Sequence, residues 1–315
     1  MIVEKIALIG GGLIGQAWAI VFARAGHQVA LYDASPLTME QAQKNIASRL
    51  EDLARFKLAD DPATTFQRIS WSIKPGDAVN GAAYVQESVP ERPEVKKEVY
   101  KQLDQLIGDE TIIGSSTSGL PASAFTESLA CRSRCLVAHP INPPSVTPLV
   151  ELCPAPWTDR AVVDRVFELM TKIGQSPIGV KKEVPGFIAN RLQGALLTMA
   201  LRLVEDGVCS MEDIDIAIRD GIGRRWSFMG PFETIDLNAP GGIADYMARY
   251  GPLYEEIEGS AKEPLDWSGT LAQGLEVERR KRLSADALPE RSEWRDRRLM
   301  ALAAHKRAAD EKIGE

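Results

Sequence analysis

The sequence has 315 residues, of which 44% are hydrophobic and 26% charged, with a formal net charge of −7. Its length predicts two domains, and its negative charge argues against a nucleic-acid partner and favours a small-molecule one. No apolar run reaches the roughly 18 residues that span a bilayer, and the N-terminus lacks a secretory signal pattern, so we expect no membrane association and a cytoplasmic location.

The first half of the chain alternates short apolar runs with amphipathic stretches. The apolar runs predict strands at residues 5–10, 27–33, 82–89, 110–116 and 134–140. Helices are predicted after Gly12, after Pro36, at 93–107 and at 121–130. Strands separated by helices pair in parallel through right-handed crossovers. The pattern therefore predicts an α/β fold with a doubly wound parallel sheet.

A second pattern begins at Pro185, where long helical segments replace the alternation. Residues 187–207 are apolar on nearly every face, which is typical of a helix buried between neighbours or in a subunit interface. Residues 292–315 predict a solvated terminal helix with an apolar stripe. We therefore expect an α/β domain at residues 1–184 and an all-α domain at residues 185–315.

A glycine-rich turn joins the first predicted strand to the first predicted helix. Its G-x-G-x-x-G pattern allows a tight turn, a close approach of pyrophosphate to the backbone and close packing of helix on strand. The helix N-terminus adds free N–H groups for the phosphates. We predict a Rossmann-type dinucleotide site that uses Gly10, Gly12, Leu13, Ile14 and Gly15. The alternative is a tight turn without a ligand.

An acidic residue follows at the end of the second predicted strand. Asp33 lies 18 residues after Gly15, where such sites place a carboxylate on the adenosine ribose. Asp33 would repel a 2′-phosphate, and no arginine directly follows it. The predicted cofactor is therefore NAD rather than NADP. No metal is predicted, because the four cysteines and three histidines have no ligand spacing.

One histidine lies where chemistry is expected. His139 ends the strand at 134–140, and Glu151 follows twelve residues later in another apolar run at 148–154. The proline-rich segment between them cannot be helical, so a chain reversal would set the carboxylate beside the imidazole. Such a carboxylate orients the ring and stabilises the imidazolium that forms when the ring accepts a proton. A histidine paired only for stability is the alternative.

Several motifs closely resemble the 3-hydroxyacyl-CoA dehydrogenase superfamily, over nearly the whole chain from Lys5. They are the glycine-rich turn, ESVPE with a following lysine, SSTSG, HPINPP and PGFIANRL. The longer phrases VAHPINPPSVTPLVEL, GIGRRWSFMGPFET and EWRDRRLM are most similar to the branch of lambda-crystallin and L-gulonate 3-dehydrogenase. The resemblance implies a homodimer.

The resemblance also implies roles for individual residues. His139 would be the general base and Glu151 its orienting partner, while Ser118 and Asn190 would hydrogen-bond the reacting oxygen. Glu91, Lys96 and Asn142 match positions near the ribose and nicotinamide. An acid substrate also needs a cation, and Arg225, or its neighbour Arg224, is the candidate because guanidinium binds a carboxylate through two bonds. A surface arginine without this role is the alternative.

The implied reaction is the NAD-dependent oxidation of the secondary hydroxyl of a small 3-hydroxy acid, with L-gulonate first. Acyl-CoA members usually have asparagine where this chain has Ser116, and a shorter run where it reads GIGRRWSFMGP. These departures argue against a CoA thioester. Open alternatives are an L-carnitine dehydrogenase, a short-chain 3-hydroxyacyl-CoA dehydrogenase and a structural NAD-binding protein without turnover.

Overall fold

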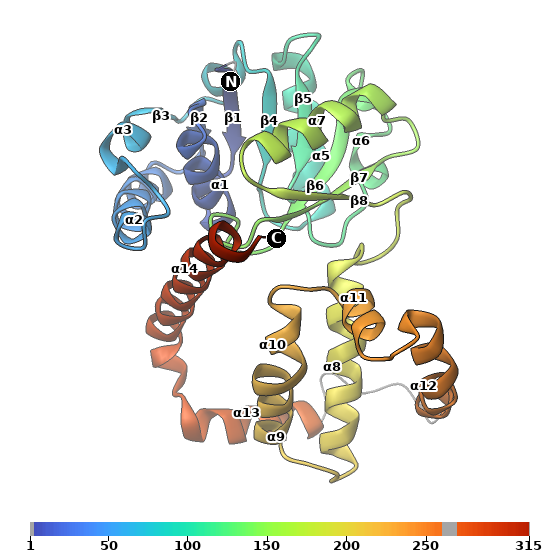
Figure 1. Ribbon diagram of the computed structural model, residues 1–315. Helices are drawn as coiled ribbons and strands as arrows, with labels where there is room; N and C mark the ends of the chain where they lie inside the picture. Colours follow the sequence, from blue (N-terminus) through green and yellow to red (C-terminus); the bar gives the residue numbers. More distant parts are fainter. Residues whose placement is uncertain (1–2, 260–269, 315) are drawn as a thin grey trace. The chain divides into compact units, whose positions relative to one another are not determined.

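The computed structural model describes residues 3–259 and 270–314. Contacts divide the chain into two compact units, of which the first comprises Met1–Arg191 with Ser292–Glu315 and the second Leu192–Arg291 (Figure 1). No helix of the described residues combines the length and the apolar character that crossing a membrane requires.

The first unit is built on an eight-stranded sheet with the order β3-β2-β1-β4-β5-β6-β7-β8. The strands are β1 (Lys5–Ile9), β2 (Gln28–Tyr32), β3 (Ile69–Ser72), β4 (Tyr84–Glu87), β5 (Ile112–Ser115), β6 (Cys135–Pro140), β7 (Leu149–Pro154) and β8 (Ser176–Gly179). Every neighbouring pair is parallel except β6 and β7, which are antiparallel. The order 3-2-1-4-5-6 is that of a dinucleotide-binding sheet, with its switch point between β1 and β4.

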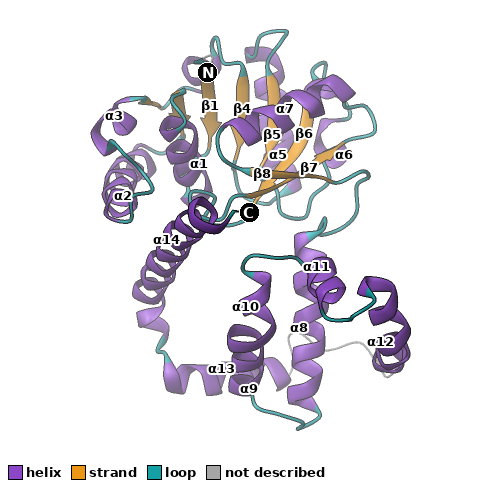
Figure 2. Cartoon of the chain, viewed as in Figure 1, coloured by secondary structure: helices purple, strands orange, loops and turns teal. Residues whose placement is uncertain are grey.

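Helices cover both faces of this sheet (Figure 2). They are α1 (Leu13–Arg24), α2 (Pro36–Arg55), α3 (Pro62–Gln67), α4 (Pro75–Val79), α5 (Pro93–Leu106), α6 (Ser123–Thr126) and α7 (Arg160–Lys172), with a 3₁₀ turn at Arg132–Arg134. Alternate residues of β1 enter separate cores, since Ile6 and Leu8 pack with Trp18 in one and Ala7 and Ile9 belong to the other. This period of two explains why a continuous apolar run forms a strand buried on both faces.

The second unit consists of helices, among the residues that the structure describes. In chain order come α8 (Ala189–Glu205), which starts in the first unit, α9 (Met211–Ile216), a π-helical turn (Ala217–Ile222), α10 (Gly223–Trp226), α11 (Pro231–Leu237), α12 (Gly242–Gly259), α13 (Thr270–Arg282) and a 3₁₀ turn (Ala285–Ala287). The last helix, α14 (Leu288–Ile313), leads back to the first unit.

The predicted fold class is confirmed, as a parallel-dominated sheet followed by helices. The sequence analysis did not identify β3, β8, α3, α4 or α7. The two strands carry polar residues or proline, which weaken the apolar signal of a strand. The predicted division at residue 185 placed the last helix in the second domain, whereas its contacts lie in the first unit. There Met300 is buried and Asp296 pairs with Arg49 at 2.6 Å. The boundary at 185 itself stays a prediction.

Candidate active site

The glycine-rich turn lies at the carboxyl end of β1, at the switch point of the sheet. Gly10 has φ +107°, and a Cβ there would lie 2.7 Å from the Ser88 carbonyl oxygen of the neighbouring loop. A Cβ on Gly15 would lie 1.8 Å from the Gly10 carbonyl oxygen, whereas a Cβ on Gly12 would meet nothing within 4 Å. Gly12 is the N-cap of α1 and has no side chain to cap it, so the first N–H groups of the helix, including those of Leu13 and Ile14, suit a pyrophosphate.

We expect Gly15→Ala to weaken NAD⁺ binding by about tenfold or more, because the new methyl group forces the Gly10 turn and α1 apart. Isothermal titration calorimetry of folded protein measures this effect. Gly274→Ala is the matched control, since a Cβ at that glycine of α13 meets nothing within 4 Å. Unchanged affinity in Gly15→Ala would show that the dinucleotide does not use this turn.

Asp33 follows β2 and is held by two backbone groups. Its Oδ2 accepts a hydrogen bond from Gly11 N at 2.9 Å and its Oδ1 accepts one from Ser35 N at 2.9 Å. The carboxylate is therefore fixed beside the glycine-rich turn, as the predicted ribose contact requires.

His139 and Glu151 face each other across the antiparallel pair of β6 and β7. They are direct partners in the strand register, and His139 Nδ1 lies 2.7 Å from Glu151 Oε2. Both side chains are buried, and the His139 ring packs against Phe187 with 5.7 Å between ring centroids. Because an ionised carboxylate only accepts, Nδ1 carries the proton and Nε2 of the neutral ring is left as the base.

The second oxygen of Glu151 binds the beginning of α8. Glu151 Oε1 accepts hydrogen bonds from Ile188 N at 2.7 Å and from Ala189 N at 2.9 Å. Burial tends to raise the pKa of the Glu151 carboxyl, but the hydrogen bonds from His139 and from these N–H groups outweigh it and hold the pKa below its ordinary value. One carboxylate thus orients the imidazole and anchors the helix that carries Asn190.

Ser118 lies in a loop that Glu91 organises. Glu91 Oε1 accepts hydrogen bonds from Thr117 Oγ1 at 2.5 Å, Ser118 N at 3.1 Å and Gly119 N at 3.0 Å. Burial tends to raise the Glu91 pKa, but these bonds and the nearby charge of Lys96 hold it below its ordinary value. Asn190 Nδ2 donates to the Ser118 carbonyl oxygen at 2.8 Å, so the two predicted oxygen-binding residues are adjacent.

Lys96 is engaged inside the protein. Its Nζ contacts both carboxylate oxygens of Glu87, at 2.9 and 3.0 Å, and its side chain is 1% exposed. Ser115 Oγ donates to Glu87 Oε2 at 2.6 Å, and Glu91 Oε2 lies 3.9 Å from Lys96 Nζ. Lys96 therefore links the end of β4 to the following loop, which carries Glu91. Its predicted contact with the cofactor stays a prediction.

A partly buried network around Ser116 was not predicted from the sequence. Ser116 Oγ accepts hydrogen bonds from Trp18 Nε1 at 3.2 Å and Gln86 Nε2 at 2.7 Å, and lies 2.9 Å from Ser88 Oγ. Gln86 also donates to the Ala138 carbonyl oxygen at 3.1 Å, next to His139. A glutamine inside the apolar run of β4 was the one signal in the sequence, since a buried amide needs partners.

Two predicted residues lie apart from these contacts. Asn142 follows β6 and is exposed. Arg225 lies in the second unit, where its Nη1 donates to Asn238 Oδ1 at 3.3 Å. Their predicted roles stay predictions.

The elements that carry these residues explain why they meet. Ile9, Glu87 and Ser115 are in register across β1, β4 and β5, and Ser115 pairs with Val137 of β6, two residues before His139. The glycine-rich turn, the Ser118 loop and His139 therefore share the carboxyl edge of the sheet, which is where ligands of such sheets bind. A dinucleotide site beside a base is suited to hydride transfer coupled to proton transfer.

Two family models match consecutive parts of the chain. Residues 5–184 match the 3-hydroxyacyl-CoA dehydrogenase, NAD binding domain, and residues 186–281 match the 3-hydroxyacyl-CoA dehydrogenase, C-terminal domain.

Curated relatives and solved structures agree with these matches. Lambda-crystallin of Oryctolagus cuniculus is 39% identical over 307 residues, which are 96% of each chain. L-carnitine dehydrogenase of Pseudomonas putida is 38% identical over 251 residues, which are 79% of this chain and 78% of the relative. The structure of FHMPC 5-dehydrogenase, an NAD⁺-dependent dismutase, has a TM-score of 0.84 and 29% identity and covers 98% of this chain and 99% of its own.

Proposed function

This chain belongs to the 3-hydroxyacyl-CoA dehydrogenase family and is an NAD-dependent dehydrogenase that acts on CH–OH donors, and on that basis we propose that it oxidises the 3-hydroxyl of a small acid such as L-gulonate. The observation that carries the proposal is the 2.7 Å contact of His139 with Glu151 at the edge of the sheet that bears the glycine-rich turn.

Each side chain has a defined part in the proposed reaction. His139 Nε2 accepts the hydroxyl proton, while Glu151 stabilises the resulting imidazolium through Nδ1–H. Ser118 and Asn190 hydrogen-bond the substrate oxygen and stabilise the negative charge that develops on it. Bound NAD⁺ supplies the hydride acceptor. Glu91 positions Ser118 through its backbone N–H, and the start of α8 carries Asn190.

Two features support a small acid over a CoA thioester. The chain departs from the acyl-CoA pattern at Ser116, whose hydroxyl is occupied by Trp18 and Gln86. Arg225 Nη1 donates a hydrogen bond to Asn238 Oδ1, and a guanidinium has five N–H donors in a geometry that suits a substrate carboxylate. L-carnitine is the second candidate, because an L-carnitine dehydrogenase is 38% identical.

A substrate panel tests this proposal. L-gulonate, L-carnitine and 3-hydroxybutyryl-CoA are each supplied with NAD⁺ or NADP⁺, and formation of the reduced cofactor is followed by absorbance. We expect the highest kcat/KM with L-gulonate and NAD⁺. A higher value with L-carnitine or with the thioester would reassign the substrate while leaving the dehydrogenase activity in place.

The pH dependence of the two directions should be opposite. Oxidation requires a neutral His139, so we expect kcat/KM for the alcohol to rise with pH. Reduction of the ketone requires the protonated ring, so its kcat/KM should fall as the pH rises. The lowered pKa of Glu151 keeps its carboxylate ionised throughout, so protonation of Glu151 does not contribute to either pH profile. Flat profiles in both directions, at constant ionic strength, would remove His139 from this role.

We also propose a homodimer that covers α8. Within the part of the chain that the structure describes, none of the 17 residues of this helix is buried, although its sequence is largely apolar. Leu192, Leu196 and Leu197 are 65%, 37% and 43% exposed. Apolar side chains gathered on one helix favour association with a second copy. Light scattering should give twice the chain mass of 34.5 kDa, and Leu192→Glu with Leu197→Glu should shift it towards the single-chain value.

A further inference from the structure

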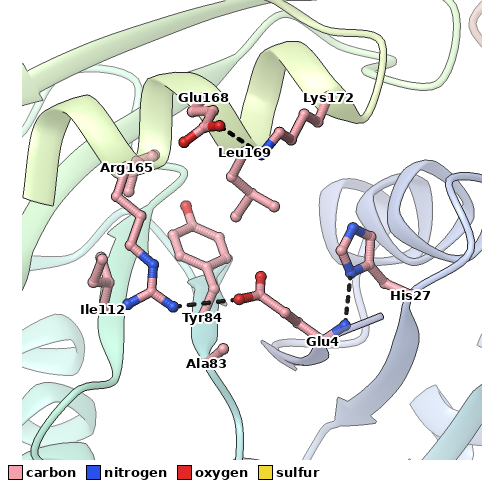
Figure 3. Close-up of a pocket in the computed structure, with 10 residues that line it drawn as sticks. Glu4, His27, Ala83, Tyr84, Ile112, Arg165, Glu168, Leu169 and Lys172 are labelled. Carbon is pink, nitrogen blue, oxygen red and sulfur yellow. Dashed lines mark hydrogen bonds and ion pairs between the residues drawn. The ribbon is translucent and has the colours of Figure 1, made fainter. Parts of the chain in front are cut away.

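A cavity lies at the amino ends of the parallel strands, away from the carboxyl ends that carry the candidate active site. It has a volume of about 130 Å³ and is lined by the residues before β1 and β2, by the first residues of β4 and β5, and by one side of α7 (Figure 3). The glycine-rich turn and His139 stand at the carboxyl ends of the parallel strands, whereas this cavity stands at the amino ends. The function proposed above does not use it.

His27 supplies a buried donor at this cavity. Its side chain is nearly inaccessible, with 2% of the residue exposed, and Nδ1 accepts a hydrogen bond from Glu4 N at 3.3 Å. The neutral ring therefore carries its proton on Nε2. Within the described part of the chain, Nε2 has no hydrogen-bond partner. A buried N–H group without an acceptor costs free energy, so an acceptor in the cavity would stabilise this arrangement.

The ring is held in place by the end of α1. His27 N donates to the Phe22 carbonyl oxygen at 3.1 Å, and the imidazole meets the Phe22 ring edge-on at 6.3 Å between centroids. With Glu4 fixing Nδ1, the imidazole has little freedom to turn Nε2 towards another protein group. The donor is thus a fixed part of the cavity wall.

Two cations on α7 stand at the rim. Arg165 Nη2 contacts Glu4 Oε1 at 3.3 Å, and Lys172 Nζ contacts Glu168 Oε1 at 2.5 Å (Figure 3). Arg165, Lys172 and Glu168 are exposed and Glu4 is half-buried, and ion pairs this open to solvent contribute little to stability. Both cations can therefore exchange a carboxylate partner for a ligand, or bind it in addition.

We propose that this cavity binds a compact oxyanion, a carboxylate or phosphate group, through His27 Nε2, Arg165 and Lys172. A buried neutral donor with two cations at the rim matches a group with several acceptor oxygens. The cavity, with its volume of about 130 Å³, accommodates one such group. It lies at the amino ends of the parallel strands, whereas the predicted NAD site lies at their carboxyl ends, so the two sites are separate.

Nuclear magnetic resonance of the ¹⁵N-histidine-labelled enzyme tests the proposal. The chain has three histidines, so spectra of His139→Ala and His305→Ala assign the His27 signals without altering that residue. The wild-type enzyme, saturated with NAD⁺ so that the pyrophosphate site is filled, is titrated with inorganic phosphate, acetate or neutral acetamide at constant ionic strength. We expect a saturable shift of the His27 Nε2 signal with phosphate or acetate, while His305 stays unchanged.

Variants on α7 separate a built site from a general salt effect. Arg165→Gln should weaken the anion by about tenfold. Arg160→Gln, on the same helix but outside the cavity, should leave the titration unchanged. A shift with acetate but not phosphate, or the reverse, identifies the oxyanion. A shift that does not saturate, that acetamide reproduces, or that Arg165→Gln leaves intact would show that no anion is bound through Arg165 and would overturn the proposal.

Discussion

His139→Ala should abolish alcohol oxidation while the enzyme still binds NAD⁺. Removing a general base typically lowers kcat by about 10²–10⁴-fold, and here no other imidazole is paired with a carboxylate among the described residues. NAD⁺ affinity should persist, because the glycine-rich turn and Asp33 belong to other elements, β1, α1 and the loop after β2. Steady-state kinetics and calorimetric titration with NAD⁺ measure the two quantities.

His305→Ala is the matched control for this substitution, since His305 is exposed on α14. It should retain the wild-type kcat and NAD⁺ affinity. Loss of NAD⁺ binding together with turnover in His139→Ala would indicate misfolding, and thermal unfolding would reveal it. Retained turnover in a folded His139→Ala enzyme would place the base elsewhere.

Glu151→Gln should lower kcat by about a hundredfold or more, although less than loss of the ring. If the glutamine oxygen still accepts the hydrogen bonds from the N–H groups of Ile188 and Ala189, the glutamine NH₂ group faces His139 Nδ1. That nitrogen must then accept, so the ring proton moves to Nε2 and blocks the base. Some activity remains, because the other tautomer stays accessible at a finite cost in free energy.

The kinetic signature distinguishes this effect from a merely structural one. KM should change little compared with kcat. The rise of kcat/KM with pH should be displaced to lower pH, because the imidazolium has lost the carboxylate that stabilised it. Glu110→Gln, at an exposed position, is the control and should be silent. Wild-type kcat in Glu151→Gln would show that the pairing with His139 serves stability alone.

Local patterns determined much of the fold. The apolar runs of β1, β2, β4, β5, β6 and β7 are buried strands, and the predicted sheet and its helices are confirmed. The spacing of Gly10, Gly12, Gly15 and Asp33 predicted a dinucleotide site, since those residues belong to one βαβ unit. Such signals are readable because each depends on neighbours close in sequence.

The sequence also placed His139 near Glu151, through the proline-rich reversal between their strands. It could not show that they are register partners, because a shift of one residue in the pairing would turn one side chain to the other face of the sheet. The role of Glu91 in organising the Ser118 loop was likewise hidden, since the bonds join residues 26–28 positions apart.

The sequence by itself thus determined the fold class, the family and the identity of the chemical groups, because periodicity and short motifs are local properties of the chain. Only the tertiary structure decided how those groups are held. Glu151 binds both the imidazole and the start of α8, Lys96 is enclosed with Glu87, and His27 Nε2 has no hydrogen-bond partner among the described residues. These arrangements arise from contacts between distant segments, whose packing fixes burial, hydrogen-bond partners and pKa values that no local pattern encodes.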